Sequence, residues 1–125
     1  MPTILVVDDE GPVRVSLIIT LERMFPSFTM AEAETIEAGI TKAREIGAEL
    51  TLVILDGNTK SQMTGLQGAP IIRDLCPKAK IIILSGNQTE EFGQEAERVA
   101  DLFLEKPVGP KVFINEIKRL LSTVS

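Results

Sequence analysis

Short apolar runs alternate along the chain with longer stretches in which apolar residues recur at helical spacing. The runs that predict strands are residues 3–7, 28–31, 50–55, 80–84 and 101–104. Three of them are nearly continuous Val, Ile and Leu, which is typical of strands covered on both faces. Helical spacing predicts helices over residues 13–25, 36–46 and 113–121. Pro12 suits the first turn of the first helix, where its missing N–H costs nothing.

Two further helices, over residues 66–75 and 89–99, are predicted from weaker patterns because they contain Gly68, Pro70 and Gly93. Five strands alternating with five helices predict an α/β fold, a doubly wound parallel sheet with helices on both faces.

Length and composition narrow the functional classes. The 125 residues suit one domain spanning residues 1–125. A net charge of −5 argues against direct binding to nucleic acid, which needs a basic face. The absence of histidine excludes Ser-His-Asp and Cys-His catalysis, histidine metal ligands and a phosphohistidine on this chain.

Hydropathy and cysteine usage bear on location. No apolar run approaches the ~20 residues that span a bilayer, and the apolar start is too short for a signal peptide. The single cysteine, Cys76, fits a reducing cytosol. We therefore expect a cytoplasmic protein that does not contact the membrane.

Polar side chains follow four of the predicted strands at the point where each strand ends. Asp8, Asp9 and Glu10 follow the first strand, Asp56 the third, Ser85 the fourth, and Lys106 and Pro107 the fifth. In an open parallel sheet these ends meet at the edge where ligands bind.

The carboxylates gathered at this edge call for a cation. Two carboxylates about 4 Å apart repel by roughly 4 kcal/mol at an effective dielectric near 20, and a divalent cation such as Mg²⁺ relieves that repulsion. The pattern predicts a metal-assisted phosphoryl-transfer site, with Asp56 as nucleophile, Lys106 pairing with phosphoryl oxygens and Ser85 donating a hydrogen bond.

Each residue has a simpler structural interpretation when taken by itself. Acidic residues before a helix, such as Asp8, Asp9 and Glu10, often cap it. An Asp before Gly57 often forms a turn, a Lys-Pro pair is usual in surface loops, and a lone serine such as Ser85 is often a cap. Their coincidence at the ends of four strands is what favours the functional interpretation.

At these residues the sequence resembles the receiver domain of two-component response regulators, over essentially the whole chain. The motifs that carry the resemblance are Val6-Val7-Asp8-Asp9-Glu10, Val53-Ile54-Leu55-Asp56, Ile83-Leu84-Ser85-Gly86 and Leu102-Phe103-Leu104-Glu105-Lys106-Pro107. Each motif is weak by itself, but their order and spacing together are specific. The resemblance implies a flavodoxin-like (βα)5 fold with five strands in the order 2-1-3-4-5.

The resemblance also implies a function for the site. A sensor histidine kinase or a histidine phosphotransfer protein would donate a phosphoryl group to Asp56. Mg²⁺ would be bound by Asp9, Asp56 and the main-chain carbonyl of Asn58, while Asp8 assists through water. The donor must be another molecule or domain, because this chain has no histidine.

The resemblance further implies a switch in which Ser85 moves toward the phosphoryl group and Phe103 turns inward. The face formed by the fourth helix, fifth strand and fifth helix would be reshaped and would engage a downstream effector protein or domain. The same face could form a homodimer, although no residue requires one. The chain would be a signalling switch that phosphorylates and dephosphorylates itself, not an enzyme with an external substrate. A permanently buried ring is the alternative interpretation of Phe103.

The loop after Asp56 departs from the family pattern. Receivers usually have Met-Pro three and four residues after the phosphorylated aspartate, then Gly eight residues after it. This chain has Thr59, Lys60 and Thr64 at those positions, and its glycine comes one residue later, at Gly65. A tolerated loop variation is one interpretation. The other is that Lys60 leans toward the metal site and alters the phosphoryl lifetime or the choice of partner.

Two other functions fit parts of the pattern. A receiver-like docking module that needs no phosphorylation would fit the altered loop, but the intact acidic, hydroxyl and lysine residues argue against it. An aspartyl-phosphate hydrolase is suggested by Asp56-Gly57-Asn58-Thr59, which faintly resembles the Asp-x-Asp-Gly-Thr motif of haloacid-dehalogenase-like phosphatases. The second aspartate is missing, however, and the strand comes third rather than first. A dinucleotide-binding domain is excluded because no Gly-x-Gly-x-x-Gly follows the first strand.

Overall fold

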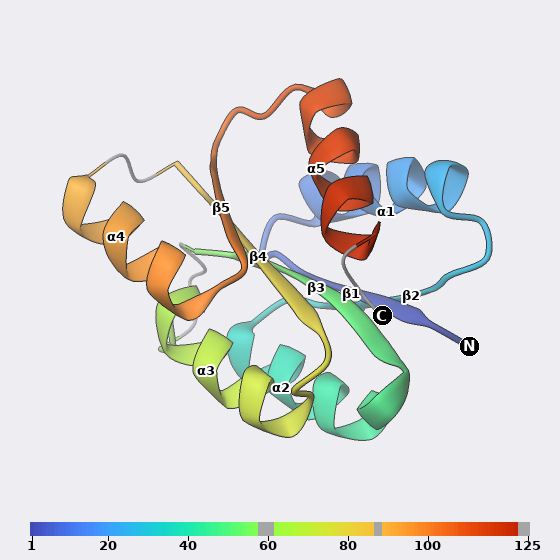
Figure 1. Cartoon of the computed structure of the whole chain (residues 1–125). Helices are drawn as coiled ribbons and strands as arrows, with labels where there is room; N and C mark the ends of the chain where they lie inside the picture. The colour runs from blue at the N-terminus through green and yellow to red at the C-terminus, as the bar shows by residue number, and fades with distance from the viewer. Residues whose placement is uncertain (58–61, 87–88, 123–125) are drawn as a thin grey trace.

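The computed structural model describes residues 1–57, 62–86 and 89–122, and these form alternating strands and helices (Figure 1). The strands are β1 (Thr3–Val7), β2 (Thr29–Ala33), β3 (Leu50–Asp56), β4 (Lys80–Ser85) and β5 (Leu102–Glu105). The helices are α1 (Gly11–Met24), α2 (Ile36–Ile46), α3 (Gly65–Leu75), α4 (Glu90–Val99) and α5 (Pro110–Ser122), and a short 3₁₀ turn, η1 (Gly47–Glu49), precedes β3. In the described part of the chain, no helix combines the length and apolar character needed to cross a bilayer.

All neighbouring strands pair in parallel, in the order β2-β1-β3-β4-β5. The predicted doubly wound, flavodoxin-like fold and its strand order are therefore confirmed. The chain winds outward from β1 to β2 on one side and through β3, β4 and β5 on the other, so the strand order reverses between β1 and β3. The carboxyl ends of these two strands flank the crevice in which such sheets place their functional groups.

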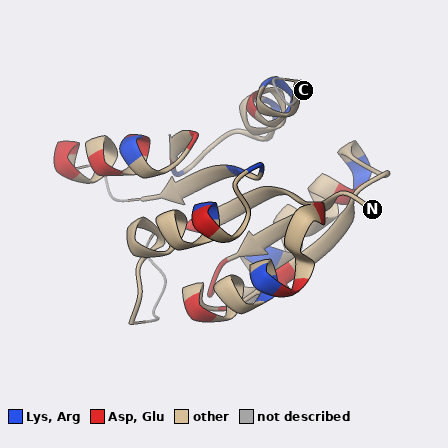
Figure 2. Ribbon diagram, turned by 60° about the horizontal axis from the view of Figure 1, so that its bottom comes forward, with Lys and Arg blue, Asp and Glu red and all other residues tan. Residues whose placement is uncertain are grey.

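Two apolar cores fill the space between the sheet and its helices. Helices α1 and α5 lie on one face of the sheet, and α2, α3 and α4 lie on the other (Figure 1). Alternate residues of β1, β3 and β4 serve the two cores, because successive side chains of a strand point to opposite faces. These three strands are almost completely buried, as their continuous apolar sequences predict, whereas the edge strands β2 and β5 are partly exposed. Figure 2 shows the charged positions mainly on helices and loops, with most strand positions uncharged.

The two helices with weak sequence patterns both form, and each has a threonine cap. The Thr64 hydroxyl accepts a hydrogen bond from the N–H of Gln67, whose side chain accepts one from the N–H of Thr64. This reciprocal capping box starts α3 and offsets the helix-breaking tendency of Pro70. Gly68 allows α3 to approach α2, because a Cβ there would clash with Cγ2 of Ile36. In the same way, the hydroxyl of Thr89 caps α4.

The edge strands depart from their predicted bounds. Strand β2 starts at Thr29 rather than at residue 28 and continues to Ala33, two residues beyond the prediction. Apolar continuity did not predict this extension, because it contains the charged Glu32. An edge strand tolerates that charge, since it is only partly buried, and the side chain is paired with Arg14 at 2.7 Å. Strand β5 is shifted by one residue toward the C-terminus and ends at Glu105.

Candidate functional site

Three aspartates meet at the carboxyl edge of the sheet. Asp8 and Asp9 directly follow β1, and Asp56 is the last residue of β3. The parallel pairing of β1 with β3, which aligns Val7 with Leu55, brings the ends of both strands together. Each aspartate offers a carboxylate oxygen, and these three atoms all lie within 4.8 Å of one another. The sequence prediction that these residues share one site is thus met by the geometry.

The turn after β1 is shaped by Asp8. Its Oδ1 accepts a hydrogen bond of 2.8 Å from the N–H of Glu10, and its own N–H donates to the carbonyl of Ala33. Glu10 is the N-cap residue of α1, and its side chain makes no capping hydrogen bond. The alternative that these acidic residues cap the helix therefore does not hold for the side chain of Glu10. Asp8 instead forms an Asx-type turn that leaves its other carboxylate oxygen toward the cluster.

Lys106 brings a positive charge to the aspartates. Its backbone N–H donates to the carbonyl of Ser85 at 2.9 Å, which fixes the residue beside the end of β4. Its Nζ lies 3.4 Å from Oδ1 of Asp56 and 3.9 Å from Oδ2 of Asp8. The ammonium is partly exposed, and it remains free to follow a ligand that enters the site.

The cluster holds more negative charge than Lys106 can offset. Burial raises the pKa of the Asp8 carboxyl; the charges of Asp56 and Asp9 add to the rise, while the N–H of Glu10 and the Lys106 ammonium oppose it. Asp8 and Asp56 are only 2% and 5% exposed, so water screens their repulsion poorly. A compact set of buried carboxylate oxygens is a suitable donor set for a small divalent cation, and Mg²⁺ uses one or two carboxylates and completes its shell with water or phosphate.

Ser85 lies at the end of β4 on the side of α4, fully buried. The N–H of Gly57 donates to the carbonyl of Leu84, so the backbone after Asp56 runs beside Ser85. A Cβ on Gly57 would lie 3.0 Å from Cβ and 3.3 Å from Oγ of Ser85. The hydroxyl predicted to reach a phosphoryl group is therefore next to the residue that follows the predicted nucleophile.

Phe92, on the first turn of α4, is a site residue that the sequence analysis missed. Its ring tip covers Gly57, because a Cβ there would lie 2.7 Å from Cζ of Phe92. The same ring makes an edge-to-face contact with Phe103, with centroids 5.7 Å apart. Phe92 thus lies between the backbone after Asp56 and the aromatic residue predicted to switch. In the sequence, Phe92 is marked only as an apolar residue three positions after the capping residue Thr89. This pattern is too common at helix starts to indicate a function.

Phe103 occupies the middle of β5, aligned with Ile83, and is partly buried against the core beneath α4. Its ring lies beside Gly93, where a Cβ would be 3.6 Å from Cε2. This position on the α4 side agrees with the face named in the sequence analysis. The predicted inward turn of the ring stays a prediction, as does the alternative of a permanently buried ring.

The displaced glycine of the loop has a structural reason. Gly65 is the first residue of α3, and a Cβ there would lie 3.0 Å from the carbonyl oxygen of Asp56 and 3.1 Å from Cα of Gly57. A glycine is needed where α3 approaches the predicted nucleophile, and Thr64, one residue earlier, is used as the cap. Asn58, whose carbonyl is expected to bind the metal, lies outside the described residues. Lys60 lies outside them as well, so both interpretations of the altered loop stay open.

Comparison with known proteins agrees with this geometry. The family model of the response regulator receiver domain matches residues 4–118. Curated relatives include the transcriptional regulatory protein ResD of Bacillus subtilis, which is 32% identical over 98% of this chain and 49% of its own length. Another relative is the phosphate regulon transcriptional regulatory protein PhoB of Escherichia coli, 27% identical over 98% of this chain and 52% of its own length.

Solved structures share the fold. A CheY-like response regulator receiver domain protein from Methanospirillum hungatei superposes with a TM-score of 0.87 at 26% identity, covering 98% of this chain and 94% of the other. The chain belongs to the response regulator receiver family, a family of two-component signalling proteins. It spans about half the length of the curated relatives it matches.

Proposed function

We propose that the chain is a phosphorylatable switch in which Asp56 accepts a phosphoryl group from a phosphohistidine of a sensor histidine kinase or a histidine phosphotransfer protein. The observation that supports this most is the position of Asp56 at the end of β3, with Asp8, Asp9 and Lys106 around it. These groups supply the three requirements of phosphoryl transfer: a nucleophile, a metal-binding set and a mobile cation.

The chemistry follows from these positions. A carboxylate oxygen of Asp56 attacks the phosphorus, the P–N bond to the donor imidazole breaks, and its electron pair stays on the imidazole nitrogen. The product is an acyl phosphate on Asp56. The Lys106 ammonium, 3.4 Å from the attacking carboxylate, neutralises charge on the phosphoryl oxygens as they arrive. Hydrolysis of the acyl phosphate by water resets the switch, so the chain modifies itself and turns over no external substrate.

Mg²⁺ is the cofactor that this donor set favours. Asp9 and Asp56 would bind it directly, together with the carbonyl of Asn58, and Asp8 would assist through water. When bound, the ion supplies charge neutralisation between the carboxylates and the incoming phosphoryl group. The excess of carboxylates over nearby cations in the described cluster supports the proposal that a divalent ion binds there.

The response to phosphorylation would pass through α4. The Ser85 hydroxyl would turn toward a phosphoryl oxygen, and Phe103 would change its rotamer, which reshapes the face of α4, β5 and α5 for an effector protein. Because Phe92 contacts both Gly57 and Phe103, a shift of the backbone after Asp56 would have a direct packing route to β5. A phosphoryl group thus shifts the equilibrium through differential contacts within one packed network.

The test is the intact mass of the chain after incubation with acetyl phosphate, with and without Mg²⁺. The expected result is a gain of one phosphoryl group that requires Mg²⁺ and is absent in Asp56→Asn. The variant Asp101→Asn, at the opposite edge of the sheet, is the matched control and should be phosphorylated like the wild type. A purified histidine kinase or phosphotransfer protein carrying phosphohistidine is the second donor. If neither donor labels Asp56, the phosphoacceptor function is wrong and the docking module takes its place.

A further inference from the structure

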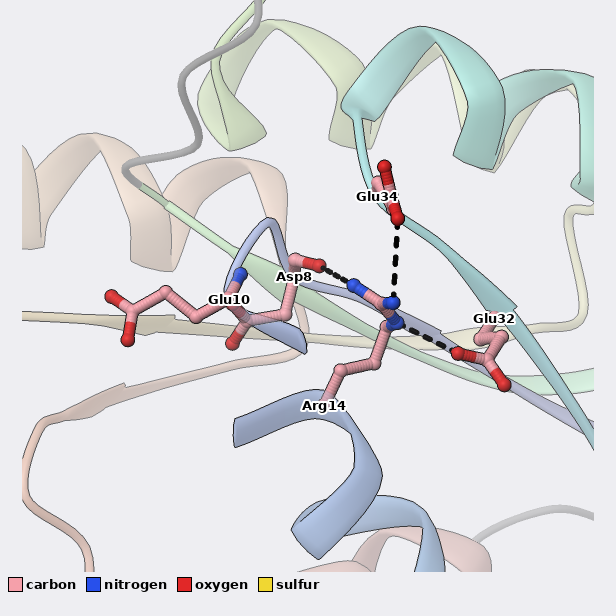
Figure 3. A network of polar contacts seen from close by, with 5 residues as sticks. All are labelled: Asp8, Glu10, Arg14, Glu32 and Glu34. Carbon is pink, nitrogen blue, oxygen red and sulfur yellow. Dashed lines mark hydrogen bonds and ion pairs between the residues drawn. The ribbon is translucent and has the colours of Figure 1, made fainter. Parts of the chain in front are cut away.

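Arg14, in the first turns of α1, is buried beside the acidic cluster but has no part in the chemistry described above. Only 9% of the surface of Arg14 is exposed to solvent. One terminal nitrogen, Nη1, donates a hydrogen bond of 2.7 Å to the main-chain carbonyl of Asp8. Its Nε donates to Oε1 of Glu32 at 2.7 Å, and its Nη2 lies 3.6 Å from Oε1 of Glu34. Figure 3 shows the guanidinium between these three partners.

The guanidinium therefore links three segments of the chain. Glu32 belongs to β2, Glu34 lies between β2 and α2, and Asp8 begins the turn that carries the aspartates. The bond to the Asp8 carbonyl sets the orientation of the peptide plane between Asp8 and Asp9. On its other side, the turn is held by the 2.8 Å bond from the N–H of Glu10 to the Asp8 carboxylate.

The charge of Arg14 is already balanced by its own partners. Two glutamates face one guanidinium, so Arg14 does not serve as a counter-ion for the aspartate cluster. Among the described residues, the cation within 4.0 Å of the Asp8 and Asp56 carboxylates is that of Lys106. Any influence of Arg14 on the site must then come from the geometry of the turn.

We propose that Arg14 is a positioning residue for the metal site: by holding the Asp8 carbonyl against β2, it fixes the turn that presents the Asp8 and Asp9 carboxylates. This inference rests on the proposed function, because it assumes that the aspartates bind Mg²⁺. Groups that orient metal ligands from behind typically change metal affinity by 10- to 100-fold when they are removed. Such groups usually hydrogen-bond to the ligand side chain itself. Arg14 instead bonds to the main-chain carbonyl of Asp8, so it positions the backbone that carries the ligands.

The direction of the effect distinguishes positioning from electrostatics. Replacing Arg14 by methionine removes a positive charge, and whatever part of that charge the two glutamates do not balance predicts tighter binding of Mg²⁺. Loss of a positioned turn predicts weaker binding. The two causes have opposite signs, so one titration separates them.

The experiment is calorimetric titration of Mg²⁺ into the unphosphorylated chain, well below its unfolding temperature. The variants are Arg14→Met, Arg14→Lys and Asp9→Asn, with Arg73→Met as the matched control. Arg73 also forms an ion pair, with Asp101 at 2.8 Å, but at the opposite edge of the sheet. We expect Arg14→Met to bind Mg²⁺ about tenfold more weakly and Arg14→Lys, which keeps the charge without the fork of donors, to be intermediate. Arg73→Met should stay within about twofold of the wild type.

Wild-type affinity or tighter binding in Arg14→Met would overturn the inference. If circular dichroism shows that Arg14→Met is unfolded, Arg14→Lys decides, and wild-type affinity in that variant overturns the inference as well. Failure of the proposed function has a different signature, because then the wild type itself would bind no Mg²⁺ and would match Asp9→Asn.

Discussion

The two edges of the sheet each hold an ion cluster, and the two clusters differ in their charge balance. At the amino edge, Asp101 pairs with Arg73 at 2.8 Å, and the same carboxylate oxygen accepts the N–H of Ile81 at 2.8 Å. One negative charge meets one positive charge there, and the pair ties α3 to β4. At the carboxyl edge, three carboxylates lie close to one another, and the ammonium of Lys106 lies 3.4 Å and 3.9 Å from two of them.

This difference agrees with a structural role for the amino-edge pair and with the function proposed for the carboxyl-edge cluster. Both contacts of Asp101 at the amino edge, to Arg73 and to the N–H of Ile81, are favourable. The charges there are balanced without a ligand. On the proposed function, the carboxyl-edge cluster would gain its full stability only when a cation and a phosphoryl group enter. Functional sites commonly retain such unfavourable arrangements, and the surrounding fold holds them in place.

The largest effect is expected from adding Mg²⁺. At a concentration about 100 times the dissociation constant, binding adds ~2.7 kcal/mol to the free energy of unfolding of the wild type. Asp9→Asn should lose most of this increment, whereas Asp101→Asn should keep it from a lower starting stability. Thermal unfolding with Mg²⁺ and with EDTA measures both. An increment that survives in Asp9→Asn would mean that the ion binds elsewhere.

Packing at the carboxyl edge gives the next effect. In Gly57→Ala the new methyl group meets Cζ of Phe92 at 2.7 Å and Cβ of Ser85 at 3.0 Å, and overpacking of this kind costs ~2 kcal/mol. Adding Phe92→Leu removes the ring tip and should recover part of the loss. Gly11→Ala is the control, because no atom lies within 4 Å of its Cβ position. Urea denaturation measures all four proteins, and a Gly57→Ala variant as stable as the wild type would contradict the contact.

A smaller effect is expected from Asp8→Asn in Mg²⁺-free buffer. Asparagine still accepts the N–H of Glu10 but removes one buried charge, so the variant should be more stable at neutral pH by ~1 kcal/mol. Because the folded-state pKa of Asp8 is raised, its stabilising contribution is full below the unfolded pKa of 3.8 and is lost as pH rises through the folded pKa.

The difference in melting temperature between Asp8→Asn and the wild type should therefore be smallest near pH 4 and grow toward neutral pH. A difference that is constant with pH, or that favours the wild type in EDTA at neutral pH, would show that repulsion does not dominate at this carboxylate.

The smallest effect belongs to the balanced cluster. Arg73→Met should lower the free energy of unfolding by only ~0.5 kcal/mol, because the Arg73 side chain is 36% exposed and water screens the pair. Its Mg²⁺ increment should equal that of the wild type. Chemical denaturation with and without Mg²⁺, in parallel with the Asp8→Asn series, measures the loss of stability and the Mg²⁺ increment. A loss comparable to that of a buried charge pair would remove the contrast between the two edges.

Much of the fold follows from short-range patterns. The continuous apolar runs of the three central strands predicted complete burial, and the parallel arrangement followed from their alternation with helices. The predicted bounds were least accurate at the edge strand β2, because pairing partners and not hydropathy decide where an edge strand ends. The site aspartates and Lys106 were predictable because residues that end parallel strands must meet at one edge.

The chain's local periodicity and the residues at its strand ends thus determined the fold class and the identity of the acidic cluster. The tertiary structure decided how that cluster is supported. Arg14 reaches the Asp8 carbonyl and Glu32, Phe92 covers Gly57, and Gly65 lies against the Asp56 carbonyl. The physical reason is that hydropathy and turn propensities act over a few residues. These supporting contacts join segments up to 35 positions apart, whose distances are set only when the helices pack on the sheet.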